Sequence, residues 1–244
     1  MDNLFGEFFG TMILLTFGCG VVANVLLERS KGQNSGWIVI VTGWAMAVLL
    51  GIFGAQATGA PQADLNPAVT LFKALNGVYQ PGHAFMTMLA ELLGGIAGGI
   101  LTFIIYYPHW EHTSDKGAKL GIFATGPAVR NIPSNFVTEM TVTFILLTMI
   151  MCIFNPKVTG ATGFVSGMGQ YLVSMLIWGI GLSLGGPTGY AINPARDLGP
   201  RIAHAILPIP GKGDSDWGYA WVPVVAPLVG AVLAFFFTKA VGII

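Results

Sequence analysis

LNPAVT at residues 65–70 returns as INPARD at residues 192–197, and these two Asn-Pro-Ala boxes decide the fold. Asn is a favoured residue at a helix N-cap. Pro fits the first helical position because its missing N–H would be unsatisfied there, and Ala continues the helix. Each box therefore predicts the start of a short helix, one over residues 66–75 and one over residues 193–206.

The composition around the boxes indicates that most of the chain lies in a lipid bilayer. Of 244 residues, 54% are hydrophobic and 9% are charged, against roughly 25% charged in an ordinary soluble domain. The formal net charge is zero, which gives no sign of a nucleic-acid partner. We expect a multi-pass integral membrane protein that binds the lipid bilayer and no nucleic acid.

Six stretches come close to the roughly 20 apolar residues that a spanning helix needs. They are residues 4–27, 37–55, 83–107, 135–154, 164–184 and 219–241. The two helices that begin at the boxes are too short to cross. A short helix at membrane depth must be buried in protein or face a water-filled cavity, so both are predicted to be re-entrant half-helices. The polar stretch 108–133 is predicted to be a surface loop.

The two halves of the chain resemble each other beyond the boxes. GEFFGTMILLTFG at residues 6–18 matches TEMTVTFILLTMI at residues 138–150, with Glu7 and Glu139 in equivalent places. The pattern indicates an internal duplication: a first repeat over residues 1–110, a connecting loop over 111–133 and a second repeat over 134–244. Because each repeat has three spanning helices, the second is inverted, and the half-helices approach each other near the midplane. The predicted fold class is an all-α membrane protein with six transmembrane helices and two re-entrant half-helices in an inverted 3+3 repeat.

Two helix N-termini that meet at the midplane affect which solutes can pass. Each carries a positive end of roughly half an elementary charge, and the two together repel cations in a low-dielectric setting. The amides of Asn66 and Asn193 can donate hydrogen bonds to a neutral solute. The boxes therefore predict a site that accepts polar uncharged solutes and discourages hydronium.

The boxes and the stretch GYAINPARDLGPR at residues 189–201 resemble the major intrinsic protein family, the aquaporins and glycerol facilitators, over essentially the whole chain. Asp197 follows Arg196 where water-selective members usually have a small residue, and Arg201 lies four positions on. Both features are similar to the glycerol-conducting branch. Asp197 and Arg201 stand at i and i+4, so we expect an ion pair. The pair is either a sign of the conducted solute or only a brace for the half-helix, with a wider pore as its indirect result.

The resemblance implies a selectivity constriction. Its four family positions fall on Trp44, Gly181, Tyr190 and Arg196, where glycerol facilitators typically have Trp, Gly, Phe and Arg. A small residue leaves width, two aromatic faces accept a carbon backbone, and Arg donors bind neighbouring hydroxyls. The Tyr190 hydroxyl either narrows the pore or adds a polar contact. Trp44 has packing, or a place at the lipid interface, as its alternative role.

Other site residues also follow from the resemblance. The residues of the boxes are Asn66, Pro67, Ala68, Asn193, Pro194 and Ala195. Pore-lining carbonyls are expected at Ala63, Asp64, Leu65, Gly189, Tyr190 and Ala191. The side chain of Asp64 stands where many relatives have His. We expect it to face solvent at an aqueous mouth, with a local field that alters gating or admits more polar solutes as the alternative.

Three acids lie inside the apolar stretches: Glu7, Glu91 and Glu139. An intramembrane carboxylate is a functional hypothesis by default, and in a transporter it would bind a coupling proton or Na⁺. In the family, the counterparts of Glu7 and Glu139 hold the re-entrant loops through hydrogen bonds. We expect this supporting role for the pair, while the role of Glu91 stays open.

The expected function is a passive channel for glycerol and other small uncharged solutes, with water, that excludes ions and protons. One alternative is a predominantly water-selective channel. Another is an ion-coupled secondary transporter that uses Glu7, Glu91 or Glu139, because inverted repeats with broken helices occur in both classes. The sequence has no metal-ligand cluster, nucleophile elbow or phosphate loop, so we expect no metal, no cofactor and no enzyme activity.

The resemblance also implies a homotetramer in the plasma membrane with both termini in the cytoplasm. That orientation places Lys73, Lys157 and Lys239 inside. It places Arg29, Lys31, Lys116, Lys119, Arg130 and Lys212 outside. The positive-inside rule favours the opposite orientation, so the charges and the resemblance make different predictions about which side each loop faces.

Overall fold

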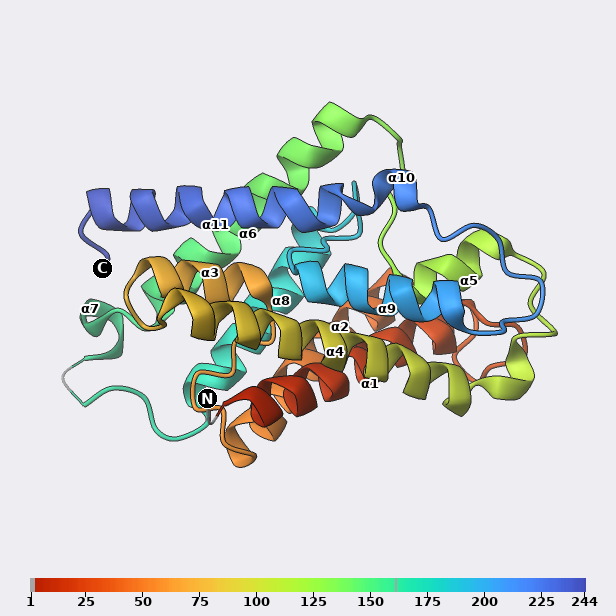
Figure 1. Ribbon diagram of the computed structural model, residues 1–244, viewed down its shortest axis with the longest axis horizontal. Helices are drawn as coiled ribbons and strands as arrows, with labels where there is room; N and C mark the ends of the chain where they lie inside the picture. The colour runs from red at the N-terminus through yellow and green to blue at the C-terminus, as the bar shows by residue number, and fades with distance from the viewer. Residues whose placement is uncertain (1–2, 161) are drawn as a thin grey trace.

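The computed structural model describes residues 3–160 and 162–244, and this part of the chain is helical, without a β-strand (Figure 1). The long helices are α1 (Leu4–Leu26), α2 (Trp37–Ala57), α4 (Pro81–Ile105), α6 (Ile132–Ile153), α8 (Met168–Leu184) and α11 (Val222–Ala240). The half-helices are α3 (Pro67–Leu75) and α9 (Pro194–Ile206). The short remaining helices are η1 (Tyr107–His109), α5 (Lys116–Phe123), α7 (Pro156–Thr159) and α10 (Trp217–Ala220).

Five of the six predicted spans are long and apolar enough to cross a membrane: α1, α2, α4, α6 and the run from α10 through α11. The sixth, α8, is apolar but has 17 residues, a length of about 26 Å at the lower limit for a span. Its predicted start at residue 164 is wrong. Gly167, with a left-handed φ of 84°, precedes the helix and fixes its start at Met168.

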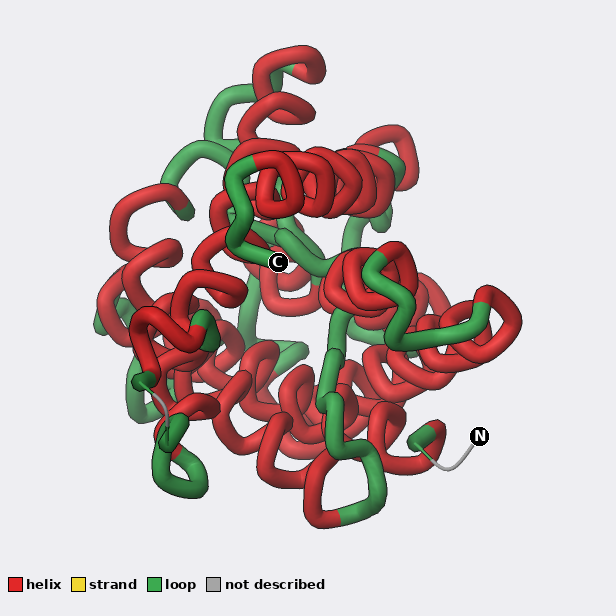
Figure 2. The backbone as a smooth tube through the Cα atoms, turned by 90° about the vertical axis from the view of Figure 1, so that its left-hand side faces the viewer, coloured by secondary structure: helices red, strands yellow, loops and turns green. Residues whose placement is uncertain are grey.

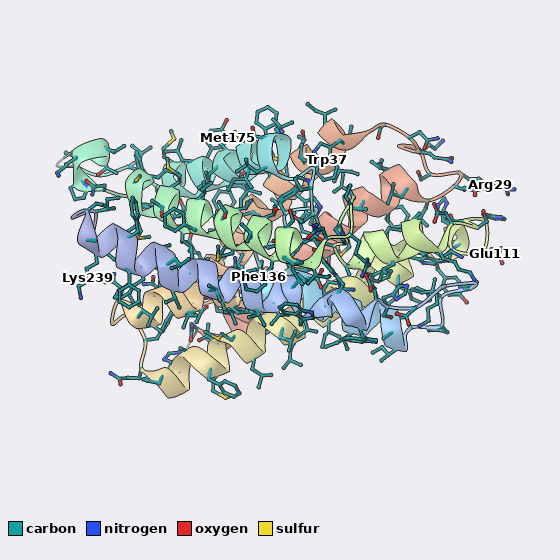
Figure 3. All side chains as sticks on the ribbon, turned by 90° about the horizontal axis from the view of Figure 1, so that it is seen from above. Arg29, Trp37, Glu111, Phe136, Met175 and Lys239 are labelled. Atoms are coloured by element: carbon teal, nitrogen blue, oxygen red, sulfur yellow. The ribbon has the colours of Figure 1, made fainter. Side chains whose placement is uncertain are left out.

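Charged side chains mark the two ends of the molecule. Arg29 and Glu111 lie together at one end and Lys239 lies at the other (Figure 3). Both chain termini lie at the Lys239 end (Figures 1 and 2). The chain therefore runs the length of the molecule an even number of times, as an inverted pair of three-helix halves requires.

Each half-helix packs against the last long helix of the other half: α3 on α11 and α9 on α4. Glycines allow the close approach of α9, because a Cβ on Gly95 would lie 2.7 Å from the Ala195 carbonyl oxygen. On the neighbouring face of α4, a Cβ on Gly98 would lie 2.7 Å from the Met12 carbonyl oxygen of α1. Small residues thus hold α4 tightly between α1 and α9.

The connection between the halves is more than a surface loop. Trp110, Ile122 and Phe123 are fully buried, and α5 packs against α1 and α9. The Trp110 ring stacks between Phe103 and Phe123. The prediction of a surface loop over residues 108–133 was wrong for this part, because a few apolar side chains anchor a segment whose average composition is polar.

Candidate functional site

A cavity of about 410 Å³ runs along the two boxes. The helices α2, α6 and α8 contribute apolar side chains to its lining, among them Val48, Ile52, Leu146, Ile150, Val173 and Ile177. The loop segments 61–66 and 190–193 and the side chain of Arg196 also line it. Trp44 and Gln56 both line the cavity, and their separation along α2 is about 18 Å. The cavity is therefore an elongated passage lined by apolar helix side chains and by polar groups of two loops.

Both Asn residues of the boxes cap their half-helices. The Oδ1 atom of Asn66 accepts a hydrogen bond from the Ala68 N–H at 2.9 Å. The Oδ1 atom of Asn193 accepts from the Ala195 N–H at 2.9 Å and from the Arg196 N–H at 3.1 Å. Pro occupies the first helical position after each cap. The boxes start helices as the sequence predicts, and the positive ends of both helices face the cavity.

The side-chain amides of the same two Asn residues join the halves. Asn66 Nδ2 donates to the Ile192 carbonyl at 2.9 Å, and Asn193 Nδ2 donates to the Leu65 carbonyl at 2.7 Å. An amide nitrogen carries two protons, so each Asn keeps one proton for another acceptor. Both residues line the cavity, where that acceptor can be a solute oxygen.

Glu7 holds the backbone before the first box. Its two carboxylate oxygens accept the N–H groups of Asp64 at 3.0 Å and Leu65 at 2.9 Å. In a planar trans peptide the C=O points opposite to the N–H. The carbonyls of Ala63 and Asp64 therefore point away from Glu7, on the cavity side of the segment. Left-handed φ values of 42° at Ala63 and 53° at Leu65 produce this arrangement.

Glu139 makes the equivalent contacts in the second half. Its oxygens accept the N–H groups of Ala191 and Ile192, both at 3.0 Å. By the same geometry, the carbonyls of Tyr190 and Ala191 point away from Glu139. Tyr190 and Ile192 have left-handed φ values of 39° and 46°, which match the first half position by position.

Two of the expected pore-lining carbonyls differ from the other four. The Leu65 carbonyl already accepts the Asn193 amide at 2.7 Å, and Gly189 is absent from the residues that line the cavity. The repeat relates Leu65 to Ile192, whose carbonyl accepts the Asn66 amide in the same way. Sequence reasoning missed Ile192 because it did not apply the repeat to the carbonyls.

Three of the four expected constriction residues line the cavity: Trp44, Tyr190 and Arg196. The Arg196 Cζ atom lies 4.0 Å from the centroid of the Trp44 ring, within the range of a cation–π contact. Gly181 lies behind Tyr190, and a Cβ there would be 2.9 Å from the Tyr190 Oη atom. Within the described residues, neither Tyr190 Oη nor Arg196 Nη1 has a hydrogen-bond partner.

Two further residues position this group, and sequence reasoning missed both. The Trp37 Nε1 atom donates to the Gly181 carbonyl at 3.0 Å, and its ring meets Tyr190 edge-on at 6.0 Å between centroids. Gly18 gives room to the Trp44 ring, which any Cβ at that position would strike. Nothing in the local sequence marks either residue, because each contact joins helices that are distant along the chain.

Asp197 and Arg201 are residues of α9, and neither of them lines the cavity. Arg201 Nε and Nη2 donate to the Asp197 carboxylate at 2.8 and 3.0 Å, and both side chains are fully buried. Asp197 also accepts two bonds of 2.7 Å from the N–H and hydroxyl of Thr125. Arg201 donates to the Ser215 carbonyl at 2.8 Å. The pair therefore braces α9 against two loops, and Thr125 is a partner that the sequence did not indicate.

Asp64 does not face solvent, so that expectation was wrong. The residue is 6% exposed. Its carboxylate forms an ion pair with Lys73 and accepts a hydrogen bond of 2.9 Å from Thr70. Thr70 and Lys73 follow the box by one and two turns of α3. Polar side chains of the half-helix itself therefore cover Asp64.

Comparison with known proteins gives a consistent result. A family model described as major intrinsic protein matches residues 1–237. The chain is 50% identical over 237 residues to a probable glycerol uptake facilitator protein of Thermotoga maritima, with 96% of each chain covered. It is 41% identical over 243 residues to a D/L-lactic acid transporter of Lactiplantibacillus plantarum, with 97% of this chain and 96% of that one covered. The X-ray structure of the aquaglyceroporin from Plasmodium falciparum matches with a TM-score of 0.85, 28% identity and coverage of 98% and 96%.

Proposed function

The chain belongs to the major intrinsic protein family, and we propose that it is a passive membrane channel for glycerol and other small uncharged solutes. The predicted resemblance and the all-helical fold class are confirmed by the family match and by the solved structure of an aquaglyceroporin. The glycerol assignment is supported by relatives named glycerol uptake facilitator protein, at 50% and 48% identity over nearly the whole chain. Members of this family are channels and not enzymes.

The observation that carries the proposal is the mixed lining of the cavity, with apolar side chains from three helices and polar groups from two loops. A polyol has carbon on one side and hydroxyls on the other. Apolar side chains of α2, α6 and α8 face the carbon side, while carbonyls near Ala63 and Tyr190 accept hydroxyl protons. Such a lining replaces the hydration of a hydroxylated solute along the passage without binding it tightly.

Selectivity in this proposal arises at Trp44, Tyr190 and Arg196. The Arg196 Nη1 atom has no partner among the described residues, which leaves it free to donate to a solute hydroxyl. The two aromatic rings face the solute carbon atoms. Gly181 sets the width of the constriction, because Tyr190 occupies the space that a side chain at position 181 would fill.

Exclusion of cations arises at the boxes. The N-termini of α3 and α9 face the same cavity, and each contributes a partial positive charge. Asn66 and Asn193 present donors there, and a hydronium or metal ion needs acceptors. Water, which accepts and donates, permeates together with glycerol.

The transporter alternative has less support. Glu7 and Glu139 each hold two backbone N–H groups, and neither lines the cavity. A coupling ion would have to displace those bonds and collapse the segments that they position. A predominantly water-selective channel differs in width at the constriction. The ratio of glycerol flux to water flux distinguishes it from a glycerol channel.

The proposal extends to assembly and location. We place a homotetramer in the plasma membrane with both termini in the cytoplasm. The position of both termini at one end of the molecule is consistent with this. Large apolar side chains are exposed along the flanks, among them Phe5, Phe85, Ile104 and Phe236, and lipid or neighbouring copies would cover them.

Stopped-flow light scattering on proteoliposomes tests the function. After a hyperosmotic glycerol step, the vesicles should shrink as water leaves and reswell quickly as glycerol enters. The initial rate of glycerol influx should rise linearly with glycerol concentration and be unchanged by Na⁺ or proton gradients. Rapid shrinkage without reswelling would instead make the protein a water channel, and accumulation driven by an ion gradient would make it a transporter.

A further inference from the structure

Thr70 lies between two carboxyl groups, and its single proton cannot serve both. Its Oγ1 atom is 2.9 Å from Asp64 Oδ2 and 2.8 Å from Glu91 Oε1. A hydroxyl carries one proton and can also accept. It therefore donates to one carboxyl oxygen and must receive a hydrogen bond from the other, since two lone pairs at this distance repel. One of the two carboxyl groups holds a proton.

The surroundings of the two acids decide which one is protonated. Lys73 forms an ion pair with Asp64 through the other carboxylate oxygen, so Asp64 is the ionised partner. Glu91 is 0% exposed, and its Oε2 atom has no hydrogen-bond partner in the part of the chain that the structure describes. An ionised carboxylate in that position would be desolvated and half unsatisfied. The proton therefore lies on Glu91, which donates to Thr70, which donates to Asp64.

The other groups around Glu91 agree with this assignment. Glu7 of α1 uses both oxygens as acceptors of backbone N–H groups, as a carboxylate does, and a negative charge there opposes a second charge on Glu91. Tyr79 lies between α3 and α4. Burial and the nearby Asp64 raise its pKa, so its hydroxyl stays neutral. Lys73 of α3 carries a positive charge, and it pairs with Asp64.

His83 is the remaining titratable side chain on this part of α4. It lies two turns before Glu91, where its ring contacts Tyr79 and its Nε2 atom bonds to Asn3. Its contacts are therefore at the start of α4, about 12 Å along the helix from Glu91.

The chain of hydrogen bonds belongs to one half of the molecule. Counting from the Asn of each box, the second half has Ala191 in place of Asp64 and Asp197 in place of Thr70. The arrangement is therefore an addition to the repeat and is not required by its symmetry.

We propose that Glu91 is a proton-binding site whose proton holds residues 61–66 in their conducting position. These residues line the cavity, and Asp64 fixes them to α3 through Thr70. Loss of the proton adds a negative charge beside Glu7 and Asp64, and Thr70 can then bind only one of its two carboxylates. Without the Thr70 bond, Asp64 is held to α3 by Lys73 alone, and the segment that presents the Ala63 and Asp64 carbonyls loosens. Permeability falls when the solution on the Lys73 side becomes alkaline.

Infrared spectroscopy of the protein in a detergent without ester groups tests the site without any transport measurement. A protonated carboxyl has a C=O stretch that is separate from the amide and carboxylate bands and that shifts in D₂O. We expect this band in the wild type at neutral pH, its loss in Glu91→Gln, and its retention in Glu111→Gln, which changes an exposed acid. Absence of the band from the wild type, or its survival in a folded Glu91→Gln protein, would overturn the proposal.

A second variant keeps the test decisive if Glu91→Gln does not fold. Thr70→Val is close to isosteric and removes the acceptor of the Glu91 proton. The band should persist and move to the higher frequency of a carboxyl without a hydrogen bond. An unchanged frequency would mean that Glu91 does not donate to Thr70, and the assignment would be wrong.

Glycerol flux against pH tests the coupling to the pore, and this part rests on the proposed function. Wild-type flux should fall as pH rises on the Lys73 side, whereas Glu91→Gln, which cannot lose a proton, should give a flat profile. A flat wild-type profile would refute the coupling even if the band is present. If the wild type conducts no glycerol at any pH, the proposed function fails and the infrared result still stands.

Discussion

A single hydroxyl distinguishes Tyr190 from the phenylalanine expected in glycerol facilitators, and it lies against Gly181 without a partner among the described residues. We expect Gly181→Ala to lower glycerol permeability about tenfold, which corresponds to roughly 1.4 kcal/mol added to the permeation barrier, because the new Cβ displaces Tyr190, with a smaller effect on water. Tyr190→Phe removes the opposing oxygen and should restore part of the glycerol flux in the double variant. The glycerol-to-water ratio in stopped-flow experiments measures both. An equal loss for both solutes would mean that the variant misfolds and does not narrow the passage.

A fully buried ion pair makes the second prediction at this scale. Arg201→Gln leaves Asp197 buried beside Thr125 with less compensation, and breaking such a pair costs about 3–5 kcal/mol. We expect a marked fall in thermal stability in detergent. Arg130→Gln is the matched control, because its pair with Asp216 is exposed and such pairs contribute about 0–1 kcal/mol. Equal losses in the two variants would contradict the bracing role of Arg201.

At the residue scale, sequence reasoning works best where one residue has one dominant partner type. The caps at Asn66 and Asn193 follow from helix chemistry. The supporting role of Glu7 and Glu139 stays a prediction from the repeat and the family, and their bonds to backbone N–H groups are consistent with it. Asp64 was placed wrongly, because its burial depends on two side chains that come later in α3.

Close approach between α4 and α9 gives a prediction at the scale of elements. A Cβ at Gly95 would lie 2.7 Å from the Ala195 carbonyl oxygen, so Gly95→Ala must displace the start of α9 and with it Arg196. We expect a loss of about 1–3 kcal/mol of stability and reduced glycerol flux. Gly20→Ala on α1 meets nothing within 4 Å and should leave the glycerol flux unchanged without lowering stability. Thermal unfolding and flux of the two variants decide, and normal behaviour of Gly95→Ala would refute the tight contact.

Apolar length predicted the helices well and their boundaries less well. Five spans and both half-helices were placed within a few residues. The start of α8 was missed because Gly167, and not hydrophobicity, determines it. The burial of α5 was missed because composition averages over a segment, whereas packing depends on where Ile122 and Phe123 point.

Topology is the prediction that belongs to the whole molecule. Ser114 and Lys157 lie in connections that the family orientation places outside and inside the cell, respectively. In a Cys152→Ser background, we expect a membrane-impermeant thiol reagent to label Ser114→Cys but not Lys157→Cys in intact cells, and both after lysis. The positive-inside rule predicts the reverse. Labelling of Lys157→Cys alone would therefore overturn the orientation, with both termini outside.

Blocking the cavity along the two boxes tests most directly the claim that glycerol passes through it. Val173 lines the cavity on α8, and Leu93 is 49% exposed on α4, away from it. Each is changed to Cys in the Cys152→Ser background, and influx into proteoliposomes is measured before and after labelling with a bulky methanethiosulfonate reagent. We expect the label at Val173→Cys to abolish glycerol influx and a reductant to restore it, with Leu93→Cys unaffected. Full labelling of Val173→Cys with undiminished influx would mean that glycerol does not pass along this cavity.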